Sequence, residues 1–146
     1  MVRLSGIDRN TAMHMHTEDL DSPIARIKGM HVLVVDDNIQ AADSLAMLLS
    51  KVGAPAGALY SGEEVLSHDL SSNQILLVDV SMPHIDGHRV VQTLRERGVT
   101  VPIIALTGHS MPEDVQAAMD AGYSAHLTKP IGLKELTEAI VALTQT

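Results

Sequence analysis

Short apolar runs alternate with amphipathic stretches along the chain from Met30 onward. The runs are apolar at consecutive positions, as in parallel strands that helices cover on both faces: Val32–Val35, Ala58–Tyr60, Ile75–Val78, Ile103–Leu106 and, more weakly, Ala125–Leu127. The stretches that follow them repeat apolar residues at helical spacing, over residues 38–52, 62–70, 87–97, 112–121 and 133–143. Five such alternations predict a doubly wound α/β domain, in which five helices flank a five-stranded parallel sheet.

The ends of the predicted helices carry residues that commonly start or stop a helix. Two segments have the spacing of a capping box, in which a Ser and a Glu bond to free backbone amides: Ser61 to Glu64, and Ser110 to Glu113. Glycines follow three helical stretches, where a left-handed cap favours a residue without a Cβ atom: Gly53, Gly98 and Gly122. These signals support the helix boundaries that the periodicity predicts.

Residues 1–29 show no sustained hydrophobic period. They mix acidic and basic residues with Ser and Pro, a composition typical of linkers and tails. We therefore expect a poorly ordered linker or tail over residues 1–29 and one folded domain over residues 30–146. The total of 146 residues suits a single domain with a tail.

The composition excludes several classes of function. The chain has 10 Lys and Arg against 18 Asp and Glu, and its basic residues are scattered, so we expect no direct nucleic-acid binding. It has no cysteine, which excludes disulfides, thiolate zinc sites and cysteine nucleophiles. Its apolar runs are too short to span a bilayer and no signal-peptide pattern follows Met1. We therefore expect a cytoplasmic domain without membrane contact.

The residues just after the predicted strands are candidates for chemistry, because ligands of an open parallel α/β sheet bind beyond the carboxyl ends of its strands. Asp36 and Asp37 follow the first strand, and Asp79 follows the third. Thr107 follows the fourth strand and Lys129 follows the fifth. A single Asp at a strand end is often only a turn former or a helix cap. Independent strand ends rarely supply this whole set, so the sequence predicts a polar site at this edge.

Three carboxylates at one edge of a sheet would repel one another unless a cation lies among them. Carboxylate and carbonyl oxygens suit a hard divalent ion, and the chain offers neither a thiolate nor a well-spaced pair of imidazoles. We therefore expect Mg²⁺ as the cofactor, with Mn²⁺ as a substitute.

Four segments resemble the signature of the receiver domain of two-component response regulators. They are residues 32–38 (VLVVDDN), 79–87 (DVSMPHIDG), 105–108 (ALTG) and 128–130 (TKP). Residues 106–114 and 125–130 are most similar to receivers attached to hybrid histidine kinases. The resemblance covers roughly residues 30–146 and implies a flavodoxin-like (βα)5 fold with strand order 2-1-3-4-5.

The resemblance implies a role in a phosphorelay. A histidine kinase or a histidine phosphotransfer protein would pass a phosphoryl group from a phosphohistidine to Asp79. Asp37 and Asp79 would bind Mg²⁺ directly, and the backbone carbonyl of Ser81 would be a third protein ligand. Asp36 would act on the metal largely through water.

The resemblance also implies how the domain would respond to phosphorylation. Thr107 would bond a phosphoryl oxygen, and Lys129, joined to Pro130 by a cis peptide bond, would pair with the phosphoryl group. The conformation would switch on the face of the fourth helix, the fifth strand and the fifth helix. His126 stands where the family usually has Tyr or Phe. Either His126 acts as a pH-sensitive switch, or it stays exposed and contributes only solubility; both alternatives are open.

A small apolar patch is expected around the acidic edge of the sheet. Ile39 and Ala42 lie near the start of the first predicted helix, and Pro130 and Ile131 directly follow Lys129. Apolar residues at a polar site indicate a contact surface, and the family's geometry makes this patch the docking site of the phosphodonor. A weak homodimer is a further alternative.

Three rival functions share parts of this pattern. A flavodoxin-like nucleotide binder needs an amide-rich loop where Asp36 and Asp37 would repel phosphates. A phosphatase with an Asp nucleophile needs a spaced Asp pair on one loop, whereas this pair is adjacent. A receiver-like interaction module that is never phosphorylated is the third. An isolated receiver would only phosphorylate itself from phosphodonors and dephosphorylate itself, and the sequence leaves open whether the chain is a stand-alone regulator or part of a hybrid kinase.

Overall fold

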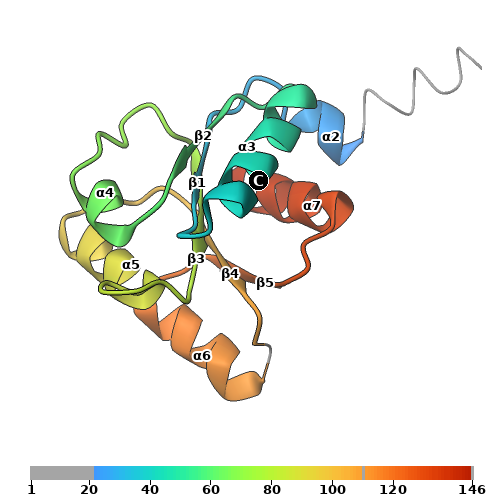
Figure 1. The fold of residues 1–146 in the computed structure, drawn as a ribbon. Coiled ribbons are helices and arrows are strands. Elements are labelled where there is room, and N and C mark those ends of the chain that lie inside the picture. The colour runs from blue at the N-terminus through green and yellow to red at the C-terminus, as the bar shows by residue number, and fades with distance from the viewer. Residues whose placement is uncertain (1–21, 110, 146) are drawn as a thin grey trace, which may run out of the picture.

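The computed structural model describes residues 22–109 and 111–145 (Figure 1). The linker or tail expected over residues 1–29 lies mostly outside this range. Residues 22–29, which were assigned to the same tail, are described and pack against the domain.

The centre of the molecule is a parallel sheet in the order β2-β1-β3-β4-β5, as predicted (Figure 1). Its strands are β1 (Val32–Val35), β2 (Ala56–Leu59), β3 (Ile75–Asp79), β4 (Ile103–Thr107) and β5 (Ala125–Thr128). Every residue of the three inner strands β1, β3 and β4 is buried. Burial on both faces explains why these runs are apolar at consecutive positions. The edge strands β2 and β5 are only partly buried, which explains their weaker signals.

Helices cover both faces of the sheet and create two hydrophobic cores. On one face lie α2 (Pro23–Arg26), α3 (Ile39–Lys51) and α7 (Leu133–Thr144) (Figure 1). On the other lie α4 (Gly62–Leu66), α5 (Gly87–Glu96) and α6 (Pro112–Ala121). Five of these helices match the predicted ones, although α4 is shorter than expected, and α2 is an addition. Within the described residues, no helix is long and apolar enough to cross a membrane.

The predicted helix caps are only partly confirmed. The hydroxyl of Ser61 accepts a hydrogen bond from the backbone N–H of Glu64 at 3.1 Å, as a capping box requires. The box predicted from Ser110 is wrong, because α6 begins at Pro112 and Met111 occupies the cap position without a side-chain acceptor. All three predicted glycines have left-handed backbones, with φ of 103° at Gly53, 88° at Gly98 and 115° at Gly122.

Candidate functional site

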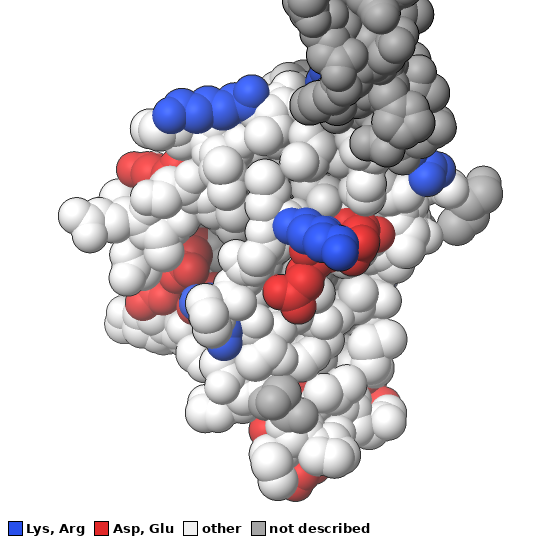
Figure 2. All heavy atoms as spheres, turned by 90° about the vertical axis from the view of Figure 1, so that its right-hand side faces the viewer, with Lys and Arg blue, Asp and Glu red and all other residues white. Residues whose placement is uncertain are grey.

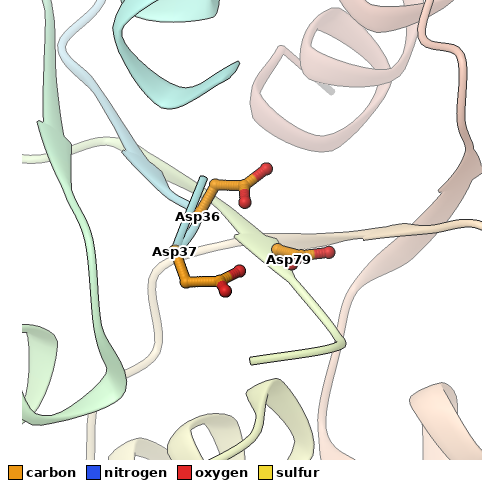
Figure 3. Close-up of side chains that lie close together, drawn as sticks. All are labelled: Asp36, Asp37 and Asp79. Carbon is orange, nitrogen blue, oxygen red and sulfur yellow. The ribbon is translucent and has the colours of Figure 1, made fainter. Parts of the chain in front are cut away.

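Three carboxylates meet at the carboxyl edge of the sheet (Figure 3). Asp36 and Asp37 follow β1, and Asp79 is the last residue of the neighbouring strand β3. One carboxylate oxygen from each residue lies within 4.8 Å of the other two. Asp36 and Asp79 are buried, whereas Asp37 is exposed. The predicted acidic cluster is therefore assembled by adjacent inner strands, with one open side toward solvent.

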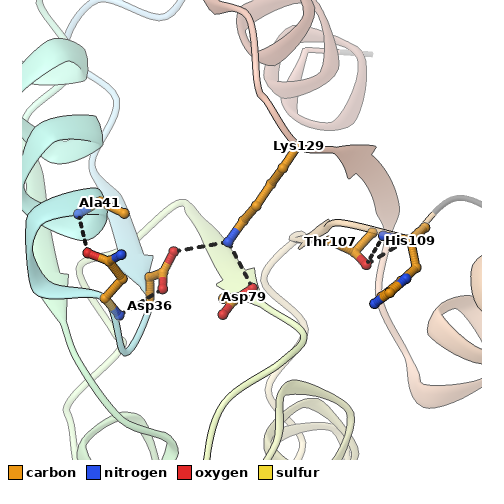
Figure 4. Close-up of polar contacts among 7 residues, drawn as sticks. Asp36, Ala41, Asp79, Thr107, His109 and Lys129 are labelled. Carbon is orange, nitrogen blue, oxygen red and sulfur yellow. Dashed lines mark hydrogen bonds and ion pairs between the residues drawn. The ribbon is translucent and has the colours of Figure 1, made fainter.

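Lys129 brings a positive charge into this cluster from the end of β5. Its Nζ lies 3.1 Å from Asp79 Oδ1 and 3.3 Å from Asp36 Oδ2 (Figure 4). The peptide bond between Lys129 and Pro130 is cis, as the family resemblance implied. The ammonium thus bridges two buried carboxylates that would otherwise face each other unneutralised.

The pKa values of Asp79 and Lys129 follow from this arrangement. Burial raises the pKa of Asp79, and the nearby negative charge of Asp36 raises it further, against the hydrogen bond and charge of Lys129. Burial by itself would lower the pKa of Lys129. The hydrogen bond to Asp79 and the charges of both carboxylates outweigh that effect, so the Lys129 pKa is raised. Lys129 is therefore a permanent cation of the site.

The loop after β3 is shaped by Gly87, the first residue of α5. The backbone N–H of Gly87 donates to the Val80 carbonyl at 3.0 Å. A Cβ atom at Gly87 would lie 2.6 Å from the carbonyl oxygen of Asp79 and would also overlap the buried Tyr123 hydroxyl. Only glycine lets α5 begin this close to the end of β3. The same loop contains Ser81, whose backbone amide bonds to the Asp79 carboxylate and opposes the rise in its pKa.

The Thr107 hydroxyl is directed at its own loop in this structure. Thr107 ends β4 and is buried. Its Oγ1 accepts a hydrogen bond from the His109 N–H at 3.0 Å and donates to the His109 carbonyl at 3.3 Å (Figure 4). The pattern of strand ends did not point to His109. His109 contacts Thr107 only through its backbone N–H and carbonyl. Such backbone contacts leave little trace in the sequence, and a Thr-Gly-His turn is only a weak signal for them.

His126 contacts the same loop from the edge strand β5. The side chain is half-buried, and Nε2 lies 3.2 Å from the His109 carbonyl oxygen. His126 and Thr107 therefore share one acceptor. Both also line a cavity of about 50 Å³, together with Val80, His88, His109, Asp114 and Ala118.

The residues of the expected docking patch differ in accessibility. Ile39 is 56 % exposed, Pro130 is exposed and Ile131 is half-buried. Ala42 is 0 % exposed because it lies on the face of α3 that packs against the sheet. Ala42 therefore offers no surface to a partner, and the patch consists of the other three residues.

The charges on the face of the molecule that lies on the right-hand side of Figure 1 are of both signs. On the face shown in Figure 2, Lys and Arg side chains stand apart from one another, and acidic side chains lie between them. This distribution matches the net charge of −8 of the whole chain.

Comparison with known proteins identifies the class to which this fold and site belong. Residues 32–141 match the family model described as the response regulator receiver domain. The chain belongs to this family, the receiver domains of two-component and phosphorelay systems. Receiver domains bind Mg²⁺ at an acidic pocket and interact with histidine kinases or phosphotransfer proteins.

Individual relatives include receivers of hybrid kinases. The chain is 32 % identical over 133 residues to probable histidine kinase 2 of Oryza sativa subsp. indica, covering 78 % of this chain. It is 32 % identical over 122 residues to the sensor histidine kinase RcsC of Escherichia coli strain K12, covering 82 % of this chain. In both cases it spans only 13 % of the kinase. The solved receiver domain of the Arabidopsis thaliana histidine kinase CKI1, complexed with Mg²⁺ and BeF3⁻, has 28 % identity and a TM-score of 0.72. That match covers 85 % of this chain and 95 % of the CKI1 domain.

We predict that Asp79→Asn removes a pH-dependent loss of stability. Because the pKa of Asp79 is raised above its ordinary value of 3.8 in the folded state, the folded protein holds that proton more tightly than the unfolded chain. The stability that protonated Asp79 adds to the folded state is fully present below pH 3.8 and is lost as the pH rises through the folded-state pKa of Asp79. Urea unfolding in metal-free buffer should therefore show the variant gaining stability over wild type as the pH rises toward neutrality.

Asp69→Asn is the control with the opposite sign. The backbone N–H of Ser71 lowers the pKa of Asp69, so wild type gains stability over this variant as pH rises. A pH-independent difference between wild type and Asp79→Asn would show that burial of the Asp79 carboxylate imposes no electrostatic penalty.

Proposed function

We propose that this domain accepts a phosphoryl group on Asp79 from a phosphohistidine, in a reaction that requires Mg²⁺. The donor would be a histidine kinase or a histidine phosphotransfer protein. The observation that carries the proposal is the cluster of Asp36, Asp37 and Asp79 with the Lys129 ammonium among them. Two buried carboxylates that share one ammonium do not serve packing, whereas together they suit a group with several anionic oxygens and a divalent ion.

The donor set of the site fits Mg²⁺. It consists of carboxylate oxygens, one of them on the exposed Asp37, which leaves room for water ligands. Asp37 and Asp79 would hold the ion directly, with the Ser81 carbonyl as a third protein ligand and Asp36 acting largely through water. When bound, the ion neutralises the oxygens of the transferring group. The CKI1 receiver, which is similar in fold, contains Mg²⁺ together with BeF3⁻.

Asp79 would act as the nucleophile. One carboxylate oxygen forms a bond to phosphorus while the bond from phosphorus to the donor imidazole nitrogen breaks. The electron pair of that bond returns to the imidazole. Carboxylates are weak nucleophiles, so the reaction depends on positioning and on charge neutralisation. Lys129 already lies 3.1 Å from Asp79 and would move one of its hydrogen bonds to a phosphoryl oxygen.

Thr107 would link phosphorylation to a change of conformation. To bond a phosphoryl oxygen, its hydroxyl must leave the backbone of His109. His126 would register this movement because its Nε2 contacts the same carbonyl. The response would appear on the face of α6, β5 and α7, which corresponds to the fourth helix, fifth strand and fifth helix of the family.

We predict that acetyl phosphate adds one phosphoryl group to the wild-type chain in the presence of Mg²⁺. Asp79→Asn should add none, because the amide keeps the shape of the side chain but lacks the nucleophilic oxygen. Chelation of the metal should also prevent labelling. Intact-mass spectrometry measures the added mass in each case. Asp69→Asn, at an exposed position near Gln74 and Pro102, which precede β3 and β4, should be labelled like wild type. Absence of labelling in wild type would favour the non-phosphorylated interaction module instead.

We predict that Ile39→Gln slows phosphoryl transfer from a phosphohistidine protein about three- to tenfold, because it removes the most exposed large apolar side chain of the docking patch. The substitution adds no charge near the carboxylates, so labelling by acetyl phosphate should not change. Met47→Gln is a matched control, since Met47 lies on the same helix and is 57 % exposed, against 56 % for Ile39. Equal transfer rates in the two variants would exclude docking at Ile39.

A further inference from the structure

Helix α7 is connected at both of its ends to the segment that contains β1. Near its N-terminal end, Lys129 contacts Asp36, the residue that follows β1. At its C-terminal end, Gln145 contacts Arg26, which precedes β1. Between these ends, Leu136 and Ile140 are fully buried in one core with Val32 and Val34. The two end contacts differ in kind, because one involves the acidic site and the other does not.

The contact at the C-terminal end is made by a segment outside the family match, which begins at residue 32. We call residues 22–30 the α2 strap. The Arg26 Nε donates to Gln145 Oε1 at 3.1 Å, and the Gln145 Nε2 donates back to the Arg26 carbonyl. Ile27 is completely buried in the core beneath α3 and α7. Helix α2 packs against α7 on this face of the sheet (Figure 1).

The other end of the strap is fastened to the loop after α3. The backbone N–H of Gly29 donates to the Gly53 carbonyl at 2.7 Å. The methylenes of Lys28 cover Gly53 so closely that a Cβ atom there would lie 2.8 Å from Lys28 Cγ. Met30, at the end of the strap, is also buried. The strap is therefore held by a buried side chain and by backbone bonds, independently of the carboxylates.

The contact at the N-terminal end is exchangeable. Lys129 is four residues before Leu133, the start of α7, and its partners are Asp36 and Asp79. A phosphoryl group on Asp79 would compete for the same ammonium. A change at this point reaches α7 through only three intervening residues.

We propose that the α2 strap is an anchor that holds the C-terminal end of α7 while its N-terminal end responds to the state of Asp79. The response of α7 is thereby confined to its first turns, and the strap keeps its position in both states. The anchoring itself stands on the contacts above. The response at the other end rests on the proposed function.

The anchor is tested first by hydrogen–deuterium exchange in the metal-free chain of 146 residues. Gln145→Ala removes both bonds between these residues and should raise exchange over residues 23–29 and 141–145 about five- to tenfold. Arg26→Ala removes only the bond that Nε donates, because the backbone carbonyl remains, and should raise exchange in the same regions to a smaller extent. The double variant should exchange like Gln145→Ala alone, because the loss of the Gln145 side chain already removes both bonds. Gln116→Ala, which removes an exposed side-chain bond on α6, is the matched control and should leave both regions unchanged. Wild-type exchange in both single variants would overturn the anchor.

The second arm adds Mg²⁺ and beryllofluoride to the same proteins. In wild type, exchange should change over residues 129–136 and stay constant over 141–145. In Gln145→Ala, the change should extend to residues 141–145. Equal changes at both ends of α7 in wild type would contradict a fixed C-terminal end. Failure of the proposed function is recognised separately, by the lack of acetyl phosphate labelling, and the metal-free arm still decides whether the strap is an anchor.

Discussion

Repulsion between the carboxylates of Asp36, Asp37 and Asp79 is the interaction on which the rest of the site depends. Two of these groups are buried, so water cannot screen them well, and the Lys129 ammonium pairs with both but carries only one positive charge. The remaining negative charge attracts a divalent cation. The three carboxylates and one ammonium leave an excess of negative charge that a packing role does not explain. This excess suits a divalent metal ion together with a ligand that has anionic oxygens.

The sheet makes this arrangement possible. Because all five strands are parallel, their carboxyl ends form one edge, and residues distant in sequence meet there. Asp36 and Asp79 come from adjacent inner strands, whereas Lys129 reaches across from the edge strand β5. A hydrophobic core on each face of the sheet holds the ends of the inner strands in place. Gly87 brings the first turn of α5 directly beneath Asp79, so the loop that carries Ser81 stays close to the cluster.

Hydrophobic pattern and strand ends predicted most of the fold and the charged part of the site. A run of consecutive apolar residues is a strong signal for a buried strand, and the residue that follows such a strand has a definite place at the sheet edge. Features that depend on packing were not predictable in this way. The burial of Ala42 follows from which side of α3 meets the sheet, and the Ser110 cap failed because Pro112 begins α6. The α2 strap could not be predicted from periodicity, because its four-residue helix is too short to show a hydrophobic period. It is held by the buried Ile27 and by the contact of Arg26 with Gln145, which lies 119 residues further along the chain.

Whether these carboxylates form a metal site is decided by calorimetric titration of Mg²⁺. We expect one binding event per wild-type chain. Asp37→Asn, which replaces an exposed ligand without disturbing the buried pair, should weaken binding at least about tenfold. Asp69→Asn, at an acidic residue outside the cluster, should bind the ion like wild type. Equal Mg²⁺ affinity in wild type and Asp37→Asn would show that the three carboxylates do not form a metal site.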